Sequence, residues 1–407
     1  MTQASQILDR DGSTLYDPRR AQRLLAEAQI DLLLASRRAN VAYLTDSFAI
    51  QYWQYPDVAN LLEVEDDGCP GPHYFAGLPR DTTASPFAIA HENRTYVYRQ
   101  RGGGCVRDVR GWCERPGTGG PGRIDVLAEA IRERKLDAAT IGVEMNHLPA
   151  STLHALRDRL PRARFVPADQ VLWQMRAVKT AEELRRQQHA YRITEKIYRQ
   201  TLASIRQRAG QVTVGEIRAM QMAMATRAGC PPLLFGYAFA QSGKKRAWDM
   251  AADWTQQTFD PGDAVLLDIG LIWRGYTTDF GRNAVLGRAS AELRDVHARM
   301  VECRQQIAEL LRPGVRVADV FSAACEIRTR LKLPPREGFG HSLGIECHEY
   351  PILNAASDWV LEQGMTIVIE LVERAGPVAF LLEDAGLVAA GGWESMCQMG
   401  TELIELG

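Results

Sequence analysis

The chain of 407 residues has no long apolar run and no excess of charge of one sign. Its apolar stretches, such as residues 30–35 and 264–267, fall far short of the roughly 20 residues that a membrane-spanning helix needs. The 48 lysine and arginine residues against 50 acidic residues give a formal net charge of −2, so no basic field gathers nucleic acid or anionic membrane. We therefore expect neither nucleic acid nor membrane as a partner.

The sequence also lacks closely spaced cysteine pairs and the pattern of a signal peptide. Its eight cysteines are scattered without a Cys-x-x-Cys pair, which favours reduced thiols over a disulfide framework or a zinc knuckle. The first residues, MTQASQILDRDG, contain no basic segment followed by an apolar one, so no secretory signal is expected. These two absences predict a cytoplasmic protein.

At about 150 residues per domain, a chain of 407 residues predicts two or three domains, and its 46% of apolar residues is enough for more than one core. Apolar residues recur at helical spacing over residues 17–28, and a buried strand is predicted at 30–34. Strand-like runs at 87–90 and 96–98 interrupt a stretch rich in glycine and proline. Residues 1–174 are therefore predicted to form one α/β domain with long connections.

A boundary is expected near Met175, where the pattern changes. Thr180 and Glu183 have the spacing of a capping box, which predicts the start of a long charged helix ending near residue 208. Short apolar runs separated by glycine, proline and aspartate follow a second helix. Residues 175–407 are therefore predicted to form an α+β domain.

Acids follow several of these apolar runs. Asp268 ends the run that begins at Ala264, and Asp279 lies eleven residues further on. Glu370 and Glu383 end two later runs in the same way, and Gly376-Pro377 between these runs predicts a hairpin-like return. Each acid alone is explained as a turn residue or as the partner of an arginine, but four buried carboxylates together would need a cation or hydrogen-bond donors.

Two histidines seven residues apart, His341 and His348, lie among glycines in the same half of the chain. Glycines let the backbone pass close to a site, and a neutral imidazole is a common metal ligand. One histidine with four carboxylates favours manganese, cobalt, zinc or iron over a thiolate-type zinc site. Two such ions about 3.5 Å apart are the machinery of two-metal hydrolases.

The order of these residues resembles the pita-bread metallopeptidase family, which includes methionine aminopeptidase, aminopeptidase P, prolidase and the metal-free relative creatinase. The resemblance is strong from Met175 to the C-terminus and weak over the N-terminal domain, which is similar to the creatinase/prolidase type. It implies a homodimer with two divalent metal ions per site, manganese being the first choice. It also implies the metal ligands, which are Asp268, Asp279, His341, Glu370 and Glu383.

The resemblance also implies a role for each site residue. Asp279 and Glu383 would bridge the two ions, and Glu370 would also act as general base. His348 matches the second histidine of the family and would bind the substrate or the developing oxyanion. The substrate would be a dipeptide or another small molecule, cleaved at a C–N bond.

The chain departs from the peptidase pattern at two places. Residues 241–250 contain no histidine, although the peptidases and creatinase usually have one there. Trp248 in this segment and the non-proline Leu371 are similar to the branch that contains dimethylsulfoniopropionate lyase. A hydrolase that is not a general peptidase is the first hypothesis, and a metal-dependent lyase is the alternative.

Three aromatic residues are candidates for contacts with the substrate. Trp248 would contact the substrate directly or be an ordinary loop aromatic. Tyr52 and Trp53 would help to close the site, because aromatic rings bind cations and apolar groups, or they would form a surface or dimer contact. Cys347, next to His348, would be either a reactive thiol or, as we expect, a buried structural thiol.

Overall fold

The computed structural model describes residues 14–47, 74–92, 95, 106–113, 122–230, 233–242, 245–248 and 253–407. The chain divides into two compact units, residues 1–176 and 177–407. The boundary expected after residue 174 lies two residues before this division. Among the described residues, no helix combines the length and the apolar character needed to span a membrane.

The first unit is an α/β domain whose six-stranded sheet has the strand order β4-β3-β2-β1-β5-β6. Its strands are β1 (Leu32–Ala35), β2 (Phe75–Pro79), β3 (Phe87–His91), β4 (Asp108–Trp112), β5 (Thr140–Val143) and β6 (Arg164–Pro167). Its helices are α1 (Pro18–Glu27), α2 (Arg38–Thr45), α5 (Arg123–Glu133), α6 (Ala150–Arg159) and α7 (Asp169–Ala177). β1 lies between β2 and β5, and all four of its residues are buried. The helix and strand predicted at 17–28 and 30–34 are confirmed as α1 and β1, whereas the run at 96–98 lies outside the described residues.

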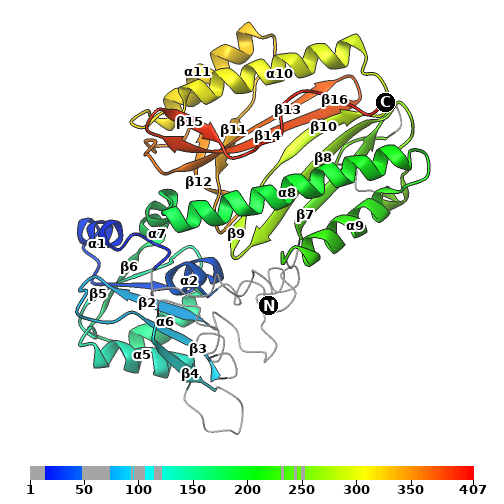
Figure 1. Cartoon of the computed structure of the whole chain (residues 1–407). Coiled ribbons are helices and arrows are strands. Elements are labelled where there is room, and N and C mark those ends of the chain that lie inside the picture. Colours follow the sequence, from blue (N-terminus) through cyan, green and yellow to red (C-terminus); the bar gives the residue numbers. More distant parts are fainter. Residues whose placement is uncertain are drawn as a thin grey trace. The chain divides into compact units, whose positions relative to one another are not determined.

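The second unit contains a ten-stranded sheet with order β12-β11-β13-β14-β10-β8-β7, and β15, β16 and β9 pair with β14, β10 and β8 (Figure 1). The first strands are β7 (Leu233–Gln241), β8 (Ala264–Trp273), β9 (Tyr276–Thr277), β10 (Gly281–Val285) and β11 (Gly338–Ser342). The later strands are β12 (Glu349–Asn354), β13 (Thr366–Ala375), β14 (Val378–Ala389), β15 (Gly392–Ser395) and β16 (Ile404–Glu405). β13 and β14 form a long antiparallel hairpin that turns at Gly376 and Pro377.

Two pairs of helices pack on this sheet, as Figure 1 shows. The helices are α8 (Ala181–Gln207), α9 (Val214–Arg227), α10 (Ala291–Leu310) and α11 (Val317–Arg330). α8 and α9 pack on β8 and β7, whereas α10 and α11 pack on β13 and β12. A separate buried hydrophobic cluster lies under each pair. The predicted capping box starts α8, because Glu183 N–H donates to Thr180 Oγ1 and Thr180 N–H donates to Glu183 Oε2.

Candidate metal centre

Three of the candidate acids lie in the middle of long strands and face away from the adjacent helices. In β8, Leu267 and Ile269 pack in the cluster under α8 and α9, so Asp268 between them faces the other side of the sheet. In β13, Ile369 and Leu371 pack in the cluster under α10 and α11 and leave Glu370 on the opposite face. Because side chains alternate along a strand, these acids lie on the face of the sheet opposite the helices that pack on their own strands.

Glu383 follows the same rule in β14, where Leu382 packs under α10 and α11. The expectation that each acid ends its apolar strand is wrong for Asp268, Glu370 and Glu383. The strands continue past the acids because antiparallel neighbours supply backbone hydrogen bonds on both sides.

The register of the sheet brings the acids together across neighbouring strands. Glu370 in β13 pairs directly with Glu383 in β14, and Gly281 in β10 pairs with both Glu383 and Asp268. A side chain at Gly281 would lie 2.5 Å from Leu381 Cδ2 and 3.3 Å from the Cβ atom of Glu383. The glycine thus lets three strands approach with their carboxylates on one face.

Asp279 lies between β9 and β10, where α8 holds its backbone. The Tyr191 hydroxyl of α8 donates to Asp279 O at 3.0 Å and accepts from Asp279 N–H at 3.0 Å. The Asp279 carboxylate then meets His341 of β11, whose Nε2 lies 3.5 Å from Asp279 Oδ2. The same nitrogen lies 4.0 Å from Glu370 Oε2 and 4.0 Å from Glu383 Oε1.

The His341 imidazole presents an unprotonated nitrogen to these acids. Its Nδ1 lies 2.9 Å from Ser342 O, and a carbonyl oxygen only accepts, so Nδ1 carries the proton. Burial, with His348 next to it, lowers the pKa of His341 to about 3, which keeps the ring neutral. Within the described part of the chain, buried His341 Nε2 and Asp268 Oδ1 have no hydrogen-bond partner. Both atoms fit a metal ion, which would replace the missing partners.

The pKa values of the four acids are raised, as expected for carboxylates that are buried close together. Burial first, and then the neighbouring carboxylates, raise the pKa of Asp268 and of Glu383 well above the usual range. Burial also raises the pKa of Asp279 to about 7 and that of Glu370 above its usual value. Divalent cations reverse this balance, because they stabilise the ionised carboxylates that burial disfavours. An oxygen-rich set with one imidazole fits such ions.

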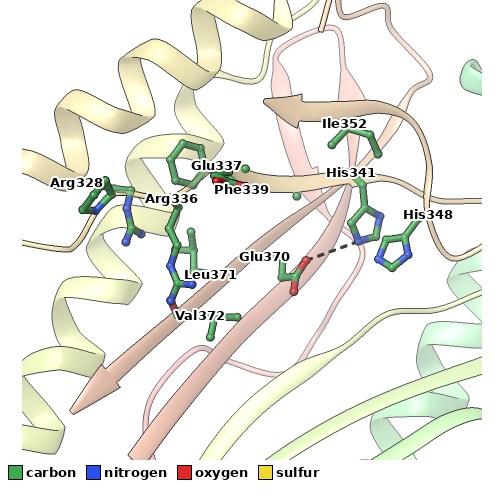
Figure 2. Close-up of a pocket in the computed structure, with 13 residues that line it drawn as sticks. Arg328, Arg336, Glu337, Phe339, His341, His348, Ile352, Glu370, Leu371 and Val372 are labelled. Carbon is green, nitrogen blue, oxygen red and sulfur yellow. Dashed lines mark hydrogen bonds and ion pairs between the residues drawn. The ribbon is translucent and has the colours of Figure 1, made fainter. Parts of the chain in front are cut away.

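A cavity of about 560 Å³ opens beside this cluster (Figure 2). Its lining includes Arg336, Phe339, His341, His348, Ile352 and Glu370. The Glu370 side chain is 38% exposed, compared with 5% for Asp279 and 3% for Glu383, so Glu370 is the more accessible acid. The His348 ring lies 4.1 Å from that of His341, nearly perpendicular to it, and is exposed.

Two supports of the histidine segment were not predicted from sequence. Lys179 Nζ lies 3.1 Å from Glu349 Oε2 in a buried ion pair and 3.4 Å from Ser342 Oγ. The Cys347 thiol donates to Asp279 Oδ2 at 2.9 Å, and burial raises the pKa of this thiol well above its usual value. Cys347 is half-buried, and its contact with the acid cluster was not predicted. The position of Cys347 next to His348 in the sequence is the feature from which this contact could have been predicted.

The aromatic candidates are not among the residues that line the cavity in the described part of the chain. Trp248 is exposed and has a positive φ of 58°, and its ring lies 6.2 Å from that of Phe239. Phe239 packs with Leu266 and Leu381, on the same sheet face as the acids. Tyr52 and Trp53 lie outside the described residues.

Comparisons with known proteins match both halves of the chain. The model of metallopeptidase family M24 matches residues 185–400, and that of the creatinase/prolidase N-terminal domain matches residues 73–178. A Xaa-Pro dipeptidase of Lactobacillus helveticus is 26% identical over 284 residues, which cover 69% of this chain and 76% of that protein. Among solved structures, X-Pro aminopeptidase from Thermotoga maritima has a TM-score of 0.75 at 21% identity and covers 96% of this chain and 99% of its own. Xaa-Pro dipeptidase from Bacillus anthracis has a TM-score of 0.74 at 22% identity, and the match covers 95% of this chain and 98% of that protein.

Proposed function

Because the chain belongs to metallopeptidase family M24, we propose that it is a metal-dependent hydrolase that cleaves a C–N bond in a dipeptide or another small polar amide. Xaa-Pro dipeptides are the first substrates to test, because similar proteins from Lactobacillus helveticus and Bacillus anthracis are described as Xaa-Pro dipeptidases. One observation carries the proposal, namely the convergence of buried carboxylates and one unpartnered imidazole nitrogen beside a cavity. The lyase alternative gains no support from the comparisons.

Five residues would hold two divalent ions, and they are Asp268, Asp279, His341, Glu370 and Glu383. Manganese is our first choice because oxygen ligands dominate, and cobalt, zinc and iron are the alternatives. Such ions supply Lewis acidity and lower the pKa of a bound water.

Glu370 and His348 would carry the proton transfer and the orientation of the substrate. Glu370 is the most accessible of the acids that face His341, so it would accept the proton of the attacking water and pass it to the leaving nitrogen. His348 would donate a hydrogen bond to the carbonyl oxygen as negative charge develops on it. The cavity volume of about 560 Å³ lies within the range of sites for small molecules, which fits a small substrate.

The test is hydrolysis of Xaa-Pro dipeptides and small amides in ¹⁸O-labelled water. Chelator-treated protein should be inactive, manganese should restore turnover, and one solvent oxygen should enter the carboxyl product. Glu370→Gln should remove most of the turnover, because an amide accepts no proton at neutral pH. A product without solvent oxygen would favour elimination, and full activity in chelator-treated protein would exclude the proposal.

Other parts of the proposal need their own measurements. Sedimentation equilibrium would test the expected homodimer, and fractionation of cells would test the cytoplasmic location. Trp248, Tyr52 and Trp53 are proposed to contact the substrate, so replacing each with alanine should raise KM while the metal content stays unchanged.

A further inference from the structure

The proposed mechanism leaves one polar group of the cluster without a role, the Cys347 thiol. Its sulfur contacts Asp279 Oδ2 at 2.9 Å, and the same oxygen lies 3.5 Å from the His341 nitrogen that has no hydrogen-bond partner in the described part of the chain. Ligand atoms of Asp279, Cys347 and His348 all lie within 4.8 Å of one another. Sulfur, nitrogen and oxygen donors therefore meet at one point beside the acids.

The spacing of these donors suits a single tetrahedral cation. Metal–sulfur and metal–nitrogen bonds of about 2.3 and 2.0 Å place two donors of one zinc ion roughly 3.4–3.6 Å apart. The sulfur–oxygen contact would lengthen by about 0.6 Å, and the remaining separations, which are 4.8 Å or less, would shorten by up to about 1.4 Å.

We propose that Asp279, Cys347 and His348 form a binding site for a thiophilic divalent cation such as zinc or cobalt, overlapping the carboxylate centre at Asp279. Binding forms one sulfur–metal bond, breaks the S–H bond and releases the proton to solvent. The inference rests on the proposed function through two shared residues, Asp279 and His348. A thiolate selects softer ions than carboxylates do, so this site and the oxygen-rich centre differ in the metal that they prefer.

Cobalt(II) added to chelator-treated full-length protein gives a direct test. A thiolate bound to cobalt has a near-ultraviolet charge-transfer band that oxygen and nitrogen ligands alone do not give. The wild type should show this band, and zinc should abolish it by displacing cobalt. Cys347→Ser and Cys347→Ala should lack the band and bind zinc at least about 10-fold more weakly at this site.

The matched control is Cys325→Ser. Cys325 is half-buried on α11, and it belongs to none of the metal-type clusters among the described residues. This variant should keep the band. Absence of the band in cobalt-saturated wild type, or its persistence in Cys347→Ser, would overturn the proposal. Failure to hydrolyse amides would leave the band unaffected, so the two proposals fail separately.

Discussion

The buried ion pair between Lys179 and Glu349 gives a prediction whose size follows from burial. The two side chains are each 1% exposed, and Nζ lies 3.1 Å from Oε2. Lys179→Met removes the ammonium that neutralises the Glu349 carboxylate, and water cannot replace it. Breaking one partner of a buried pair costs about 3–5 kcal/mol, so the free energy of unfolding should fall by that amount.

The same pair also anchors the segment that carries both site histidines. Lys179 contacts Ser342, which follows His341, and Glu349 follows His348. Lys179→Met should therefore weaken manganese binding as well as stability. Urea unfolding followed by circular dichroism measures the stability loss, and elemental analysis after gel filtration measures the retained metal.

An exposed ion pair provides the control. Arg185 and Glu182 pair at the solvent-exposed start of α8, so Arg185→Met should cost less than about 1 kcal/mol. Replacing both buried partners, as in Lys179→Met with Glu349→Leu, should recover part of the lost stability, because Glu349 then leaves no unpaired charge, whereas buried Glu183 still loses the stabilising charge of Lys179. The reasoning fails if Lys179→Met is as mild as Arg185→Met, or if the double variant is no more stable than the single one.

Three further predictions concern the metal centre and a buried acid. Asp279→Ala should lose both metal loading and turnover, and normal activity in a metal-depleted preparation of this variant would refute the assignment. His348→Ala should keep its manganese while turnover falls ~10²-fold or more, and loss of manganese would show that its role is wrong. Burial raises the pKa of Glu183 from 4.5 to about 7, so the folded state binds this proton more tightly and stability should fall as pH rises from 4.5 to 7. The free energy of unfolding should fall by about 3 kcal/mol at most over this pH range, and by less in Glu183→Gln. Urea unfolding at several pH values measures both losses, and an equal loss in the two proteins would contradict the prediction.

Local sequence signals were sufficient for the elements and the candidate donors. Thr180 and Glu183 mark the start of α8 because a capping box is a contact within one turn. Gly376 and Pro377 mark the turn between β13 and β14 for a similar reason. The candidate metal donors stand out because acids next to apolar runs are costly without partners.

The supporting contacts could not be predicted, because they join segments far apart in the chain. Lys179 and Glu349 are 170 residues apart, and Tyr191 and Asp279 are 88 apart. A single sequence gives the alternation within each strand but not the pairing of Glu370 with Glu383, which depends on the register of the folded sheet.

The carboxylate cluster is destabilising by itself, so the fold must hold it together. Burial and repulsion raise the pKa of Glu383 and Asp268, which means that folding works against their ionisation near neutral pH. The two helix-covered hydrophobic clusters fix the strands from the other face, so the acids cannot separate without exposing apolar surface. Bound divalent ions would remove this cost, and they would then stabilise the folded chain through the same residues that are proposed to serve catalysis.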